Sequence, residues 1–122
     1  MIGKVTISPD VVREVARITT LATPGVLAMA ERPAGRNNVD PGVSVIVLEA
    51  ARGDDAKGDG ANDDHGSGPT LQIKLHVIAA VNQPLHKLGQ QIQNNVAGAI
   101  AEIAGMTVTS VDVTFEDVRS QG

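Results

Sequence analysis

The segment that decides the fold is LHKLGQQIQNNVAGAIAEIAGMTVTSVDVTFEDV, residues 85–118, which reads as an amphipathic helix, a glycine stop and a strand. At 3.6 residues per turn, apolar residues spaced three and four apart fall on one narrow stripe of a helix. Six residues follow this spacing: Leu85, Leu88, Ile92, Val96, Ile100 and Ile103. Gly105 stands where a left-handed C-terminal cap is expected, and the alternation from Val111 to Phe115 predicts a strand. The helix therefore needs a second layer to cover its stripe.

A second helical unit lies near the start of the chain. Ser8 and Pro9 predict an N-cap followed by proline at the first helical position, and the helix should extend to about Leu21. We expect its buried stripe to consist of four residues: Val11, Val15, Ile18 and Ala22. Three residues are expected to point outward: Arg13, Arg17 and Thr20. A short strand is predicted before this helix, at residues 4–7, and a weaker strand after Gly25, at residues 26–30.

Two further strands and the start of the second helix complete the predicted architecture. Residues 43–48 have high β-propensity, and residues 71–77 alternate strictly between apolar and polar side chains. Asn82 or Gln83 should lie near the cap of the second helix, and Gly89 would let that helix approach the sheet closely. The order strand, helix, three strands, helix, strand predicts an α/β (α+β) two-layer sandwich. Its mixed sheet should have about four to five strands, with two helices on one face.

The 122 residues fit a single domain, residues 1–122, with one unusual insertion. From Gly53 to Pro69 the chain carries five aspartates against Lys57 alone, which accounts for the formal net charge of −4. This composition cannot bury enough apolar surface to offset the entropy of ordering, so we expect a disordered acidic loop at about residues 52–69. If this loop is read as an EF-hand that starts at Asp55, Lys57 occupies position three and Gly66 position twelve, where calcium needs oxygen ligands. The loop therefore does not match the calcium-binding pattern.

No catalytic, cofactor-binding or metal-binding residues are expected, and no small-molecule substrate. The chain has no cysteine, which removes thiolate ligands and thiol nucleophiles. Its three histidines, His65, His76 and His86, share no metal-ligand spacing, and surface histidines are the ordinary interpretation. His76 and Asp112 could share one face of the sheet, which leaves an enzyme using this pair, in a deep pocket, as a minor alternative.

The outer face of the second helix is the least ordinary surface. Residues opposite its apolar stripe are small or polar, and only Lys87 and Glu102 are charged. A solvated helix usually carries more charge and avoids interior glycine, which costs about 1 kcal/mol relative to alanine. We therefore predict a protein contact through five residues: Gln90, Gln91, Asn94, Gly98 and Ala101. Neutral drift on an exposed helix explains the same pattern equally well.

Four short motifs extend along nearly the whole chain: GKVTIS at residues 3–8, PGV at 24–26, IQNNV at 92–96 and GMTVTSVDV at 105–113. Their order and spacing resemble the alkaline shock protein family, a general-stress, cell-envelope stress-response family of Gram-positive bacteria. The resemblance implies a non-enzymatic, abundant cytosolic protein that self-associates and is held beneath the membrane by an anchored protein partner. It implies no catalytic residues.

The chain itself shows no sign of membrane insertion. Its apolar runs are too short to span a bilayer, and its first residues do not resemble a signal peptide. We therefore expect a cytoplasmic protein that reaches a membrane only through a partner.

The alternative function is a small nucleic-acid-binding or regulatory α/β module, a role that compact domains with paired helices often have. Its basic cluster would consist of Lys4, Arg13 and Arg17. A phosphate-binding surface needs a local excess of Lys and Arg, and base stacking needs aromatic side chains, of which Phe115 is the only one. We therefore do not expect a nucleic-acid partner.

Overall fold

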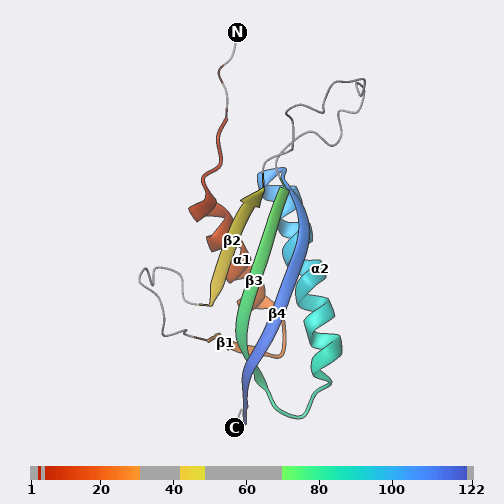
Figure 1. The fold of residues 1–122 in the computed structure, drawn as a ribbon. Coiled ribbons are helices and arrows are strands. Elements are labelled where there is room, and N and C mark those ends of the chain that lie inside the picture. The colour runs from red at the N-terminus through yellow and green to blue at the C-terminus, as the bar shows by residue number, and fades with distance from the viewer. Residues whose placement is uncertain (1–2, 4, 31–41, 49–69, 121–122) are drawn as a thin grey trace.

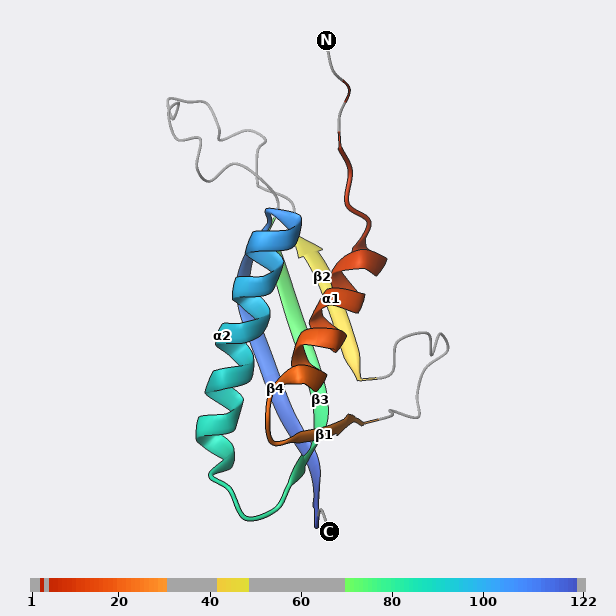
Figure 2. The ribbon, with the colours of Figure 1, turned by 180° about the vertical axis from the view of Figure 1, so that it is seen from behind.

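The computed structural model describes residues 3, 5–30, 42–48 and 70–120, which form two layers (Figure 1). The elements, in chain order, are α1 (Pro9–Ala22), β1 (Val26–Met29), β2 (Val43–Leu48), β3 (Thr70–Ala80), α2 (Leu85–Ala104) and β4 (Thr107–Arg119). Figures 1 and 2 show both helices on the same side of the sheet, running antiparallel to each other. The predicted α+β two-layer sandwich is confirmed.

The sheet is mixed and is organised around β3. β4 runs parallel to β3 and pairs with it along residues 70–80. β2 pairs antiparallel with residues 70–75 of β3, and β1 pairs antiparallel with residues 77–79. Because β4 occupies one edge of β3 throughout, β1 and β2 must share the other edge. β3 is therefore the central strand, and the helices pack over its inner face.

The core is aliphatic and lies between the sheet and the two helices. Its largest fully buried apolar side chains come from β3 and α2, with one valine from α1: Leu71, Ile73, Leu75, Val77, Ile92, Val96, Ile100 and Val12. Phe115 packs against this cluster, and its ring faces Gly89. A Cβ atom at Gly89 would lie 3.5 Å from Cε2 of Phe115, an ordinary van der Waals distance. The helix therefore approaches the sheet there without requiring glycine.

Most helix boundaries follow their predicted local signals. Ser8 Oγ accepts a hydrogen bond from the Asp10 amide at 3.2 Å, so Ser8 caps α1 and Pro9 is its first residue. Gly105 adopts φ +69° and donates its amide to the Ala101 carbonyl at 3.1 Å. This left-handed conformation ends α2 as expected, because glycine has no Cβ to oppose it.

Asn82 and Gln83 lie next to the start of α2, as expected, but neither residue caps the helix. Pro84 is the N-cap residue and makes no side-chain cap hydrogen bond. The Gln83 amide instead donates to the carbonyl of Ala80 at 2.5 Å and to that of Gly25 at 3.1 Å. It satisfies backbone acceptors at the end of β3 and just before β1, which a local cap pattern does not reveal.

The predicted buried stripe of α1 is also wrong, because the helix buries the adjacent flank. The buried residues of α1 are Val12, Ala16 and Thr20. Of the predicted stripe, Val15 is half-buried and three residues are exposed: Val11 (45%), Ile18 (54%) and Ala22. Thr20 was expected to point outward but is fully buried, and its hydroxyl donates to the Ala16 carbonyl at 2.7 Å. This bond satisfies the hydroxyl within the helix, so its burial costs little.

Two further expectations fail at the ends of elements. Residues 5–7 of the predicted first strand are not a strand, and Val5 is 87% exposed. β-propensity alone does not form a strand, because the backbone groups need a paired neighbour. Ile103 continues the helical spacing of α2 but is 62% exposed, since it lies in the last turn, at the margin of the core.

Some expectations fall outside the described residues. The acidic loop at about residues 52–69 and the segment 31–41 belong to this group, so the expected disorder of the loop stays a prediction, as does the single domain at residues 1–122. Within the described part, neither helix combines the length and apolar character needed to cross a membrane.

Candidate interaction surface on the helical layer

The five residues predicted to contact a protein share the outer face of α2, and all are exposed: Gln90, Gln91, Asn94, Gly98 and Ala101. The opposite side of α2 is buried against the sheet. The Gln93 side-chain amide also donates to the Val111 carbonyl at 3.0 Å, which fixes α2 to β4. The outer face is therefore presented by a firmly anchored helix.

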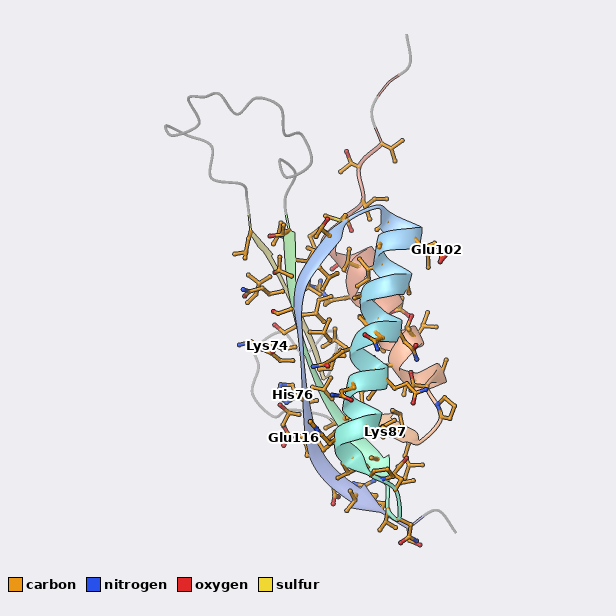
Figure 3. All side chains as sticks on the ribbon, turned by 90° about the vertical axis from the view of Figure 1, so that its right-hand side faces the viewer. Lys74, His76, Lys87, Glu102 and Glu116 are labelled. Carbon is orange, nitrogen blue, oxygen red and sulfur yellow. The ribbon has the colours of Figure 1, made fainter. Side chains whose placement is uncertain are left out.

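This outer face is open and uncharged at its centre. A Cβ atom at Gly98 would meet no atom within 4 Å outside the neighbouring helix backbone. Residues 88–101 include no charged side chain, and Lys87 and Glu102 lie near opposite ends of the helix (Figure 3). Another protein backbone could therefore approach the middle of α2 closely.

An exposed apolar strip on α1, here called the α1 stripe, consists of Val11, Val15, Ile18 and Ala22. The spacing of four, three and four residues places them on one flank of the helix. Sequence reasoning recognised this spacing but assigned the stripe to the core. The sequence did contain a sign that the stripe could be exposed. The neighbouring flank, with Val12 and Ala16, is also apolar, so either flank of α1 could be buried.

The α1 stripe lies on the outer, exposed side of α1, next to α2. Asn95 Nδ2 donates to Thr23 Oγ1 at 3.1 Å, which joins the middle of α2 to the end of α1. Seen from its N-terminus, a right-handed helix turns clockwise. With Val12, Ala16 and Thr20 against the core, this rotation turns the stripe to the outer surface of the helical layer, where α2 lies beside α1 (Figure 2). The stripe and the outer face of α2 are therefore neighbours.

Outside the stripe, α1 carries two ion pairs. Arg13 pairs with Asp10, and Arg17 pairs with Glu14, each three residues apart on the same helix. The hydrogen bond from Arg17 lowers the pKa of Glu14 below its ordinary value. The nucleic-acid alternative needs a local positive excess, which these carboxylates reduce. Its third residue, Lys4, lies outside the described part of the chain.

The outer face of the sheet presents polar side chains on the side away from the helices (Figure 3). The strand register places Lys74 beside Asp112 and His76 beside Thr114, so His76 and Asp112 share this face as expected. His76 Nδ1 lies 2.7 Å from Oε2 of Glu116, a cross-strand ion pair when the histidine is protonated. Among the described residues, no three His, Asp or Glu side chains are grouped to hold a metal ion.

Comparison with solved structures finds similarity to several MamM CTD structures. One is 9% identical, with 90% of this chain and 98% of that chain covered and a TM-score of 0.46. A second is 11% identical, with 88% and 95% covered and a TM-score of 0.44. A zinc form of a variant is 13% identical, with 93% and 88% covered and a TM-score of 0.44. Similarity at this level concerns only the broad path of the chain.

Comparison with curated proteins finds no match. A family model, in contrast, matches residues 1–120, which span both helices and all four described strands. That model is the alkaline shock protein 23 family, described by a cell envelope-related function. The chain therefore belongs to the alkaline shock protein family, as the resemblance of its motifs indicates.

Proposed function

We propose that this protein is a non-enzymatic interaction protein of the cell-envelope stress response. It self-associates in the cytoplasm and is held at the membrane by an anchored protein partner, and the outer face of α2 makes the contact. Membership of a family with a cell envelope-related function supports this role. The observation that carries the proposal is the outer face itself, which is exposed, uncharged from residue 88 to 101 and open at Gly98.

The chemistry of the outer face favours contact with a protein. Gly98 and Ala101 have no side-chain rotamer entropy to lose on binding, and depletion of charged residues is typical of the centre of an interface. Glycine in a helix interior costs about 1 kcal/mol relative to alanine. A contact that needs close approach of two backbones offsets this cost.

Gly98→Arg tests the proposal. The new side chain would project into open space, so the fold should persist while the contact is blocked. Sedimentation measures self-association, and affinity capture from the native cell in mild detergent measures recovery of a membrane-anchored partner. Thr114→Arg is the matched control, because it adds the same side chain to an exposed position on the opposite layer.

Loss of assembly or of partner recovery in Gly98→Arg, but not in Thr114→Arg, supports the proposal. Unchanged assembly and recovery, with an intact fold by circular dichroism, contradict it. Salt-sensitive retention of the wild-type chain on a heparin column would instead favour the nucleic-acid alternative, because phosphate recognition depends strongly on salt.

A further inference from the structure

The α1 stripe is an apolar surface that the described fold leaves uncovered. Its two most exposed members, Val11 and Ile18, lie on the same flank of α1 and are joined by the half-buried Val15. Single exposed apolar residues are ordinary, whereas contiguous apolar patches mark interaction surfaces. The stripe is therefore a candidate binding surface on the outer side of the helical layer.

The stripe lies level with the open part of α2. The hydrogen bond between Asn95 and Thr23 sets the position of α1 along α2. Because the helices are antiparallel, the part of α1 that precedes Thr23, which includes Ile18, runs alongside the part of α2 that follows Asn95. That part contains Gly98 and Ala101. The outer surface therefore has a protruding apolar strip on α1 and, at the same height, a flat strip on α2.

We propose that this surface binds a second copy of the chain across a two-fold axis parallel to the helices, with Ile18 of each copy packed on Gly98 and Ala101 of the other. The axis lies just outside the helical layer, midway between α1 and α2. Rotation about it places α1 of one copy over α2 of the other, at the same position along the helices. Each protruding strip then meets a flat strip. The inference rests on the proposed contact at the outer face of α2 and adds its partner and its apolar anchor.

The size of the surface favours a second helical layer over a single docked helix. α1 has 14 residues and α2 has 20, which makes them about 21 and 30 Å long. Two helices packed at a typical spacing form a layer roughly 20 Å wide, so the projected area is roughly 400 to 600 Å². A standard interface buries about 800 Å² of accessible surface on each partner. The accessible surface of two helices is larger than their projected area because it is corrugated, so the two helices together approach this value. The accessible area of the α1 stripe alone is far below this value.

Charge placement is also compatible with this dimer. The pair of Arg13 and Asp10 lies away from the stripe, whereas Glu14, one turn before Ile18, borders the stripe and is paired with Arg17. On α2, the charged residues belong to the first and last turns, at the ends of the surface, where water can still reach them. Glu14 is therefore a charged group beside the contact at Ile18, and its pairing with Arg17 offsets part of the cost of desolvating it.

Two opposite-charge substitutions test the arrangement. Ile18→Glu and Gly98→Arg should each weaken self-association by more than about 30-fold, the size typical of losing a hot-spot residue. An equimolar mixture of the two variants should associate again. One of its two contacts keeps the original residues, and the other brings the new carboxylate beside the new guanidinium. Ile46→Glu, the same change at an exposed position on the outer face of the sheet, is the matched control.

Sedimentation equilibrium separates the outcomes, with circular dichroism to show that each variant is folded. The inference is overturned if the wild-type chain stays monomeric in the millimolar range, if Ile18→Glu associates normally, or if the mixture stays monomeric. If Ile18→Glu has no effect while Gly98→Arg still loses a captured partner, the contact at α2 stands and only the two-fold dimer is excluded. If Gly98→Arg changes neither association nor capture, both proposals fail.

Discussion

Gly89→Ala should stabilise the protein by about 1 to 2 kcal/mol, although Gly89 is buried. Alanine is favoured over glycine in a helix interior by about 0.8 to 1.0 kcal/mol, and burying one more carbon contributes about 0.8 kcal/mol. Space is available, because the added Cβ would lie 3.5 Å and 3.8 Å from two ring atoms of Phe115. In a domain of this size 1 kcal/mol corresponds to roughly 4 °C, so thermal unfolding should show a rise of about 4 to 8 °C.

Gly98→Ala is the matched control for this experiment. It has the same helix propensity gain but no atom within 4 Å of the new Cβ, so it should add only about 1 kcal/mol. The difference between the two variants isolates the contact with Phe115. Both are measured in dilute protein, so that association does not contribute to the melting temperature. A lower melting temperature for Gly89→Ala beside a raised one for Gly98→Ala would refute the reasoning, because α2 would then lie closer to Phe115.

Two other predictions concern the core and the hairpin between β2 and β3. Ile92→Ala should cost about 2 to 5 kcal/mol in urea denaturation, because Ile92 is fully buried in α2; near-wild-type stability would place this stripe outside the core. Replacing residues 52–68 with a short turn should leave the melting temperature within a few degrees, because Leu48 already pairs with Thr70 across the hairpin. Loss of folding, or calcium bound by the loop aspartates, would show that the loop has a structural role.

Features that depend on short-range chemistry were predictable from the sequence. Gly105 ends α2 because its left-handed conformation suits glycine, and Ser8 caps α1 because its hydroxyl reaches the free amide of Asp10, two residues ahead. The central part of the α2 stripe, from Leu88 to Ile100, was also correct. Polar or small residues occupy the other sides of α2, so only one face could be buried. The small and polar residues opposite the apolar stripe also identified the outer face of α2 as the candidate interaction surface.

Tertiary packing alone decided which flank of α1 is buried. Two neighbouring flanks are apolar, and helical periodicity cannot choose between them. The flank that faces the core carries the smaller Ala16 and the internally bonded Thr20, both fully buried, because small side chains let α1 pack close to the sheet and α2. The bulkier Ile18 is left outside. The apolar part of the candidate surface could therefore not be read from the sequence, since the choice of flank depends on the shape of the layer that α1 packs against.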